Sequence, residues 1–269
     1  MNQTEQSSLY SNLELMSTEE ILRGVNAEDR KVAEVVSGCI PQISGLVDAV
    51  VERMKRGGRV FYLGAGTSGR LGITDASEIL PTYGVDGAFI GIIAGGDAAI
   101  RRAVEGAEDN PEQGWKDILP YNPTADDSLV GISASGGAPY VVGAVKKARK
   151  NGLLTASISC NEESALARES EFPIIAVVGP EFVTGSTRMK AGTATKLILN
   201  MISTSVMIRC GRVKGNHMVD MQLTNKKLID RGTRIIMEET GITDYETARN
   251  LLLEYGSVRK AVASVKVFL

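Results

Sequence analysis

The sequence predicts an α/β protein in which a parallel sheet is sandwiched by helices, with helical additions before and after it. Five short apolar runs alternate with amphipathic segments, which is typical of strands joined by helical crossovers. Glycine is abundant, with 29 among 269 residues, which favours many tight loops. Because such crossovers are right-handed and cover both faces of the sheet, we expect parallel, buried strands. The predicted strands span residues 59–63, 88–93, 128–132, 154–158 and 174–178.

The first part of the chain is expected to hold an arm followed by helices. Residues 1–16 are predicted to form a loose arm. Ser17 and Glu20 have the spacing of a capping box, which predicts the start of a short helix. Two further helices are predicted at 26–37 and 40–56, and Gly57-Gly58 ends the second of them. That helix carries apolar side chains at helical spacing, namely Ile43, Leu46, Val47, Val50, Val51 and Met54.

Helices are also predicted between the strands and after the last strand. The segments between strands are 68–80, 97–108, 139–150 and 162–169. After residue 178 the chain is mainly helical, at 188–209, 225–239, 244–255 and 257–268. We therefore expect three regions: an N-terminal arm with helices over 1–48, an α/β domain over 49–213 and a C-terminal helical segment over 214–269.

Composition and charge exclude several classes of function. The 30 Lys and Arg residues stand against 32 Asp and Glu residues, a net charge of −2, so no basic surplus favours nucleic acid as a partner. One histidine and three widely spaced cysteines predict neither a metal site nor a disulfide framework. No apolar run reaches the ~18 residues of a membrane span. The first 15 residues are polar and do not resemble a signal peptide, so we expect a cytoplasmic protein.

A glycine-rich loop follows the first predicted strand. Residues 64–69, Gly-Ala-Gly-Thr-Ser-Gly, match the G-x-G-x-x-G pattern of dinucleotide-binding folds. That fingerprint needs an acidic residue ~20 residues further on, where this chain has Ala94-Gly95-Gly96. The hydroxyls of Thr67 and Ser68, together with Gly66, instead favour a phosphate monoester at the start of a helix. No dinucleotide or other cofactor is expected.

A second loop of the same chemistry follows the third predicted strand. Ser133 and Ser135 offer hydroxyls, Gly136 and Gly137 let a ligand approach the backbone, and a helix is predicted to begin at Pro139. One such loop alone is usually a plain connector with a helix cap. Because the carboxyl ends of parallel strands meet at one edge of the sheet, the two loops together favour a phosphate site. Neither loop has the Walker A ending GK[ST].

The loop after the fifth predicted strand allows two interpretations. It places Glu181 before the hydroxyls of Ser186 and Thr187 and before the cations of Arg188 and Lys190, at the start of a long helix. In the first interpretation, Glu181 is a base and a cation meets an anionic ligand. In the second, Ser186 or Thr187 caps the helix and both cations are solvated. The sequence leaves both open.

Two more carboxylates are candidates for acid–base chemistry. Glu78 comes late in the helix that follows the first glycine-rich loop. Glu108 ends the predicted helix 97–108 at the edge of its apolar stripe, whereas Glu105 points toward solvent. A carboxylate beside buried surface suits acid–base work. The competing interpretation is an ordinary surface glutamate.

Five segments in order resemble the N-acetylmuramic acid 6-phosphate etherases, a family of the sugar-isomerase (SIS) superfamily. They are GRVFYLGAGTSGRLGITDASE, IAGGDAAIRRAVEGAEDN, GISASGGAPY, VTGSTRMKAGTATKLILNM and GNHMVDMQLTNKKL. The resemblance begins near residue 15 and implies an SIS phosphosugar-binding domain over 49–213, a small-molecule phosphosugar as the partner, and a homodimer. We then expect substrate contacts from Gly66, Thr67, Ser68, Ser133, Ser135, Gly136, Glu181, Ser186 and Lys190.

The resemblance also implies a reaction of amino-sugar catabolism and cell-wall recycling. It is cleavage of the D-lactyl ether of N-acetylmuramic acid 6-phosphate, which gives N-acetylglucosamine 6-phosphate and D-lactate. The family's active-site carboxylates correspond here to Glu78, in DASE, and Glu108, the second Glu of EGAE. In the ring-opened sugar the C2 proton is α to the C1 aldehyde and can be removed by a base. We expect Glu108 to be that base and Glu78 to protonate the departing lactate.

The chain departs from the family in three respects, and two rival functions are open. Gly137 stands where many etherases carry Arg, Ala138 stands where related loops carry Ser or Thr, and the sequence stops sooner than many etherases. One rival is an aldose–ketose phosphosugar isomerase, because Glu181 matches the base of some SIS isomerases. The other is a non-catalytic phosphosugar sensor. The DASE and EGAE carboxylates favour the etherase, and His217 is expected to pack rather than to bind ligand.

Overall fold

The computed structural model describes residues 3–266, which form two compact units. The sheet unit comprises residues 3–76 and 89–206, and the helical unit comprises residues 77–88 and 207–266. The predicted division at 48 and 213 stays a prediction. In the structure, the N-terminal arm and helices belong to the same unit as the sheet.

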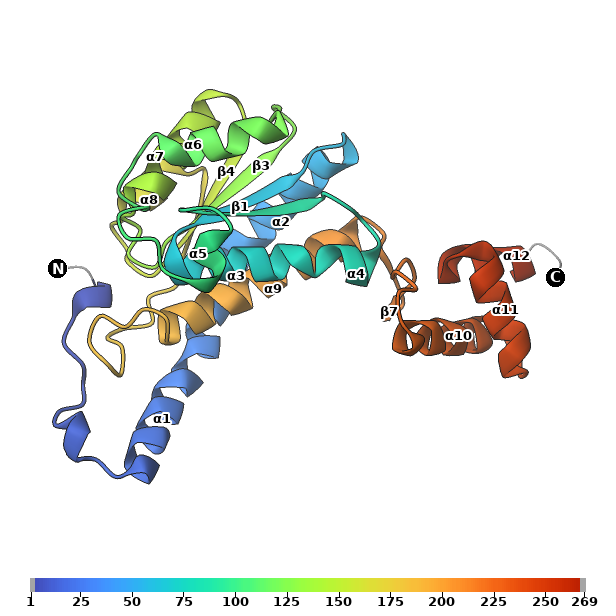
Figure 1. The fold of residues 1–269 in the computed structure, drawn as a ribbon, viewed down its shortest axis with the longest axis horizontal. Helices are drawn as coiled ribbons and strands as arrows, with labels where there is room; N and C mark the ends of the chain where they lie inside the picture. Colours follow the sequence, from blue (N-terminus) through green and yellow to red (C-terminus); the bar gives the residue numbers. More distant parts are fainter. Residues whose placement is uncertain (1–2, 267–269) are drawn as a thin grey trace. The chain divides into compact units, whose positions relative to one another are not determined.

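The sheet has five parallel strands in the order β2-β1-β3-β4-β5 (Figure 1). This confirms the predicted α/β fold. β1, β3 and β4 are fully buried, as expected when helices cover both faces. The fifth strand starts two residues earlier than predicted, and Pro173 is tolerated there because β5 is an edge strand. The strands are β1 Val60–Gly64, β2 Phe89–Ile93, β3 Ser128–Ile132, β4 Leu154–Ser159 and β5 Phe172–Ile175.

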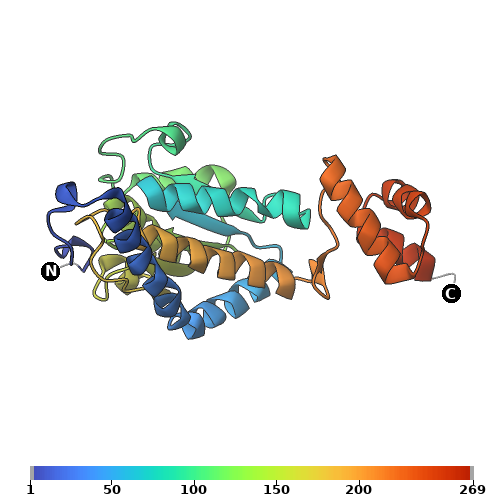
Figure 2. The same ribbon diagram turned by 90° about the horizontal axis from the view of Figure 1, so that it is seen from below.

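Helices cover both faces of the sheet (Figures 1 and 2). One face carries α2 (Ile40–Lys55), α3 (Gly66–Ser77) and α9 (Lys190–Arg209). The other carries α6 (Gln113–Ile118), α7 (Pro139–Lys150) and α8 (Ala165–Glu169). The core on the α7 side is built from alternate strand residues such as Phe61 and Leu63, which pack against Tyr140, Val141 and Val145 of α7. The sequence did not lead us to expect α6.

The N-terminal region is more ordered than expected. α1 (Thr18–Ser37) is one helix, where a short helix and a separate helix at 26–37 were predicted. Its capping box is confirmed, since Ser17 Oγ accepts from Glu20 N–H and Glu20 Oε2 accepts from Ser17 N–H at 2.8 Å. The expectation of a loose arm is wrong for residues 3–16. They contain the 3₁₀ turns η1 (Gln3–Glu5) and η2 (Leu13–Leu15), and Thr4 is buried.

The segment after β2 contradicts the predicted helix 97–108. Only α5 (Ala98–Arg101) forms there, and residues 102–108 are irregular. Gly106 has a φ of +69°, which an α-helix does not accommodate. The predicted helix 68–80 also differs, because α3 ends at Ser77 and a separate helix, α4 (Ile79–Tyr83), follows in the helical unit. A 3₁₀ turn, η3 (Leu119–Tyr121), follows α6.

The helical unit has its own core. It contains β6 (Val213–Lys214) paired with β7 (His217–Met218), and the helices α10 (Lys226–Thr240), α11 (Tyr245–Tyr255) and α12 (Val258–Lys266). Asn225 and Asp244 cap α10 and α11 with their side chains. The predicted last helix 257–268 is confirmed as far as residue 266, and its end lies outside the described residues. Buried apolar side chains hold the three helices together, among them Ile235, Ile236, Leu252, Val258 and Val262.

None of the helices within residues 3–266 is by itself both long enough and apolar enough to cross a membrane. α1 and α2 reach that length and composition only as a pair, with a bend of 56° between them.

Candidate active site

The two predicted phosphate loops line one cavity in the sheet unit. In the order β2-β1-β3-β4-β5, the strand order reverses between β1 and β3, and the crevice beyond their carboxyl ends is the usual ligand position of such a sheet. A cavity of about 260 Å³ lies at this place. Of the predicted site residues, it is lined by Gly66, Thr67, Ser68, Glu108, Ser133 and Ser135.

The loop after β1 brings backbone donors to the cavity. α3 starts at Gly66, so the first N–H groups of this helix have no acceptor within it and carry the positive end of its dipole. The glycines of the motif serve close packing. A Cβ on Gly69 would lie 2.6 Å from Ile93 Cγ1 and 2.8 Å from the Gly64 carbonyl oxygen. The motif therefore lets α3 begin directly against the sheet, with no dinucleotide needed to explain it.

The loop after β3 is held by its own serines. Ser133 Oγ accepts from Gly136 N–H at 3.1 Å, and Ser135 Oγ accepts from Gly137 N–H at 3.2 Å. Gly136 has a φ of +67°, and a Cβ there would lie 2.2 Å from Ser164 Cβ. Gly136 thus shapes the loop from behind and does not line the cavity. Ala138, at the start of α7, does line it.

Glu108 lies in the cavity for a reason other than the predicted one. It lies within the irregular segment after α5, so the helical stripe on which it was distinguished from Glu105 does not exist. The Glu108 carbonyl accepts from Tyr140 N–H at 2.9 Å, which holds this backbone against the start of α7. Glu105 lines a different cavity, of about 680 Å³.

Glu78 belongs to the helical unit. It lies between α3 and α4, directly before the first residue of α4, and its side chain is exposed.

Of the residues predicted in the third loop, only Thr187 lines the cavity. Glu181 is 1% exposed, and its carboxylate accepts from Lys190 N–H at 2.9 Å and from Ala191 N–H at 3.0 Å. It therefore caps the start of α9, a role that the second interpretation gave to Ser186 or Thr187. Ser186 does not line the cavity, whereas Thr187 does.

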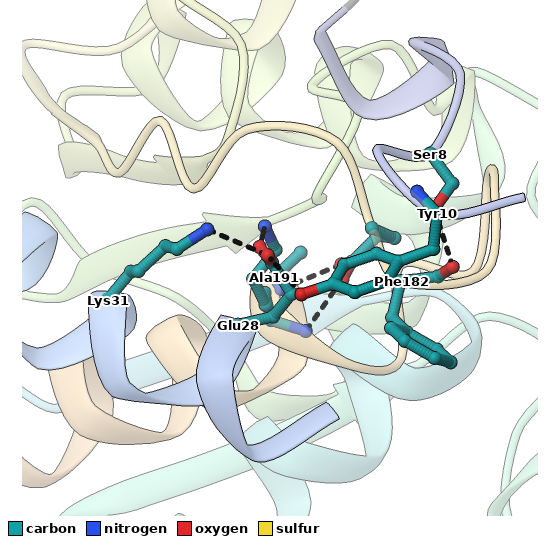
Figure 3. A network of polar contacts seen from close by, with 8 residues as sticks. Ser8, Tyr10, Glu28, Lys31, Phe182 and Ala191 are labelled. Carbon is teal, nitrogen blue, oxygen red and sulfur yellow. Dashed lines mark hydrogen bonds and ion pairs between the residues drawn. The ribbon is translucent and has the colours of Figure 1, made fainter. Parts of the chain in front are cut away.

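Lys190 is also turned away from the cavity. Its side chain is 2% exposed, and its ammonium lies 2.7 Å from Glu28 Oε2 on α1. Lys31 reaches the other oxygen of the same carboxylate at 2.7 Å, as Figure 3 shows for the labelled Glu28 and Lys31. Burial acts to raise the pKa of Glu28, but hydrogen bonds from Lys190 and Lys31 outweigh it and hold that pKa below its ordinary value. Lys190 was expected to contact an anionic substrate, but in the structure it forms its ion pair with Glu28.

Sequence reasoning missed the contribution of α9 and of the arm. The first turns of α9 lie against the β1 loop, since a Cβ on Gly192 would be 3.7 Å from Thr67 Cγ2. Glu5 of the arm also reaches the cavity, and no pattern near it signals this. The lining residues that were not anticipated are Glu5, Ala65, Ile132, Ala134, Ala138, Thr187, Ala191, Gly192 and Thr195.

His217 lies apart from these residues, in the helical unit. Its Nε2 is 3.4 Å from Glu238 Oε2, and it borders a cavity of about 520 Å³ beside α10.

Comparison with known proteins connects this site to a family. Residues 42–149 match the glucokinase regulatory protein N-terminal SIS domain. A Francisella tularensis phosphoheptose isomerase shares the fold, with a TM-score of 0.55 at 19% identity, over 72% of this chain and 100% of that one. A Bacteroides fragilis phosphosugar isomerase involved in capsule formation, described as putative, has a TM-score of 0.53 at 21% identity, over 71% and 92%.

Curated relatives cover nearly the whole chain. The Porphyromonas gingivalis N-acetylmuramic acid 6-phosphate etherase is 61% identical over 98% of this chain and 96% of its own length. The protein of the same name from Bacteroides fragilis is 56% identical over 98% and 94%, and that from Clostridium beijerinckii is 48% identical over 95% and 88%. The chain therefore belongs to the family of the N-acetylmuramic acid 6-phosphate etherases.

Proposed function

We propose that this protein cleaves the D-lactyl ether of N-acetylmuramic acid 6-phosphate and releases D-lactate and N-acetylglucosamine 6-phosphate. The observation that carries the proposal is the shared cavity, in which two hydroxyl-bearing loops and the carboxylate of Glu108 meet at the strand-order reversal. Relatives that carry this name at 48–61% identity support the choice of substrate.

The phosphate is proposed to bind at the start of α3 and along the β3 loop. The lining residues there are donors without charge: the hydroxyls of Thr67, Ser68, Ser133 and Ser135. Among residues 3–266, none of the side chains that line the cavity is Lys, Arg or His. A phosphate dianion would therefore be held by hydroxyls, backbone N–H groups and the dipole of a helix N-terminus, which together suit a phosphate monoester. Gly136, Glu181, Ser186 and Lys190 would contribute by shaping the surrounding loops.

The ether is cleaved by elimination and not by direct displacement. Once the sugar ring is open, Glu108 removes the C2 proton, the C2 electron pair forms the C2–C3 double bond, and the C3–O bond to lactate breaks. A general acid protonates the departing lactate oxygen. Water then adds to C3 of the unsaturated aldehyde and C2 regains a proton, which gives N-acetylglucosamine 6-phosphate. Glu78 is proposed as the acid from its place in the DASE motif.

The isomerase alternative is weakened by the surroundings of Glu181. A base must reach the C2 proton of the sugar, but the Glu181 carboxylate is buried and already accepts two backbone N–H groups.

We also propose that the enzyme works as a homodimer in the cytoplasm. The family resemblance supports the dimer, and the buried thiols of Cys39 and Cys160 suit a reducing compartment.

The test is to incubate the purified protein with N-acetylmuramic acid 6-phosphate and to measure D-lactate and the sugar product. We expect one lactate per N-acetylglucosamine 6-phosphate, and very slow release from unphosphorylated N-acetylmuramate, since remote phosphate binding positions the reacting carbons. A ketose phosphate as product would favour the isomerase. Binding of the phosphosugar without turnover would favour the sensor.

A further inference from the structure

The N-terminal arm is fastened to the wall of the active-site cavity. Thr4 is 2% exposed, its N–H donates to Asn161 Oδ1 at 3.1 Å, and Asn161 Nδ2 donates back to Thr4 Oγ1 at 3.1 Å. The same Nδ2 donates to the carbonyl oxygen of Ser135 at 2.9 Å. One amide side chain therefore fixes both the arm and the β3 loop that lines the cavity.

A second set of contacts fastens the arm a few residues later. Ser8 N–H donates to Thr184 Oγ1 at 2.9 Å, and Ser8 Oγ donates to the Phe182 carbonyl at 2.7 Å. The rings of Tyr10 and Phe182 lie 4.6 Å apart, and the Tyr10 hydroxyl donates to Glu28. Figure 3 shows Ser8, Tyr10 and Phe182 together in this cluster. The segment between Thr4 and Ser8 is thus held at both ends.

Glu5 lies within this doubly fastened segment and lines the cavity. A Cβ on Gly185 would lie 3.5 Å from Glu5 Oε2, which places the carboxylate beside the loop that precedes α9. Among residues 3–266, the Glu5 carboxylate has no hydrogen-bond or ion-pair partner. Glu5 therefore brings a second carboxylate side chain, besides that of Glu108, to a cavity whose other polar side chains are hydroxyls.

The charge of Glu5 determines which part of a substrate it can contact. A phosphate dianion is repelled by a carboxylate, so Glu5 does not belong to the phosphate cradle. An ionised carboxylate only accepts hydrogen bonds. The sugar portion of an N-acetylated phosphosugar presents the complementary groups, which are its hydroxyls and its acetamido N–H.

We propose that Glu5 is a substrate-contacting residue of this active site, whose carboxylate accepts hydrogen bonds from the hydroxyl or amide donors of the sugar. It also directs the phosphate to the opposite end of the cavity by repulsion. This inference rests on the proposed function for the identity of the sugar. Thr4 and Asn161 are then positioning residues that hold Glu5 in place.

The experiment compares Glu5→Gln with Glu14→Gln, a matched control on the same arm. Glu14 is exposed in η2 and does not line the cavity. Because hydrogen bonds to a charged group are the stronger ones, we expect Glu5→Gln to lower kcat/KM for lactate release by about 10- to 100-fold. Glu5→Asp, which keeps the charge, should recover part of this loss, and Glu14→Gln should match wild type.

Calorimetric binding separates contact from structural damage. We expect Glu5→Gln to weaken binding of N-acetylglucosamine 6-phosphate, while inorganic phosphate binds as in wild type or more tightly. Equal weakening of both ligands, or unchanged sugar binding together with unchanged kcat/KM, would overturn the inference. If the wild-type protein binds the phosphosugar but releases no lactate, the proposed function fails while the binding comparison still decides the role of Glu5.

Discussion

The two carboxylates proposed for the elimination lie in backbone segments of different kinds. Glu108 lies in an irregular segment, its carbonyl oxygen accepts from Tyr140 N–H in the first turn of α7, and its side chain lines the cavity. Glu78 stands at the junction between α3 and α4. Neither carboxylate forms an ion pair among the described residues.

Glu78→Gln and Glu108→Gln should each reduce lactate release by about 10²–10⁴-fold, the usual effect of losing general acid–base help. Circular dichroism should show both variants folded. In deuterated solvent, the Glu78 variant should still exchange the C2 hydrogen of the substrate, because its base is intact, and the Glu108 variant should not. The reverse exchange pattern would interchange acid and base, and wild-type turnover in both folded variants would reject the pair.

The buried pair of Glu28 and Lys190 makes a prediction about stability. Lys190→Met leaves the Glu28 carboxylate buried with only the partly exposed Lys31 beside it. Breaking a buried pair by removing one partner costs about 3–5 kcal/mol, so urea unfolding should show a loss of this order. Lys31→Met, which removes the exposed partner of the same carboxylate, should cost about 1 kcal/mol or less. Equal losses in the two variants would contradict this account.

The pH dependence of this contact follows from the lowered pKa of Glu28. A carboxyl whose pKa is lower in the folded state stabilises the fold above its ordinary pKa, ~4.3. That stabilisation is lost as the pH falls through the lower, folded-state pKa. The stability difference between wild type and Glu28→Gln should therefore be largest near neutral pH and shrink in acid. A difference that grows as the pH falls would reverse the sign.

The positions of site residues were predictable where those residues directly follow the strands of the parallel sheet. The hydroxyls of Thr67, Ser68, Ser133 and Ser135 follow strand ends, and parallel strands bring such ends together. Glu5 was not predictable, because its place depends on hydrogen bonds between Thr4 and Asn161, 157 positions apart. No local pattern records such a contact.

At the scale of elements, the close approach of α3 to the sheet depends on Gly69. A Cβ there would meet Ile93 and the Gly64 carbonyl at less than 3 Å. Gly69→Ala should therefore destabilise the protein by about 1–3 kcal/mol, as overpacking does, and should disturb the cavity at the start of α3. The control is Gly45→Ala in α2, where the nearest side-chain atom lies 3.7 Å away.

Gly45→Ala should leave stability unchanged or raise it by up to about 1 kcal/mol, since alanine is the better helix former. Thermal and urea unfolding of the two variants measure the contrast. If Gly69→Ala is as stable as Gly45→Ala, the glycine of the motif serves the ligand and not the packing of α3.

The same physics explains which elements could be predicted. Buried parallel strands are short apolar runs, so β1 to β4 were placed within about one residue of their observed ends. α7 was placed correctly because Pro139 marks its first residue. The helix predicted at 97–108 failed because the backbone is already extended at Arg102 and left-handed at Gly106, and apolar periodicity does not reveal such breaks.

At the scale of the molecule, the proposed homodimer requires an exposed surface that a second copy would cover. The long helix α9 has both buried and exposed apolar side chains. Ile198 and Ile202 are fully buried within the sheet unit, whereas Ile208 is 48% exposed. Met201 is more than a third exposed, and Leu22 on α1 is 63% exposed. These exposed apolar side chains are candidates for an interface with a second copy.

We expect the active species to sediment at about 57 kDa, twice the 28.7 kDa of the chain. A stable interface of this kind buries on the order of 1,200–2,000 Å², so the dimer should persist on dilution to micromolar concentration, with and without phosphosugar. Leu22→Ser removes one exposed apolar contact and should weaken association if α1 takes part. Sedimentation velocity combined with lactate release decides the matter, because an active species of 28.7 kDa would show that a single chain contains every residue that the reaction needs.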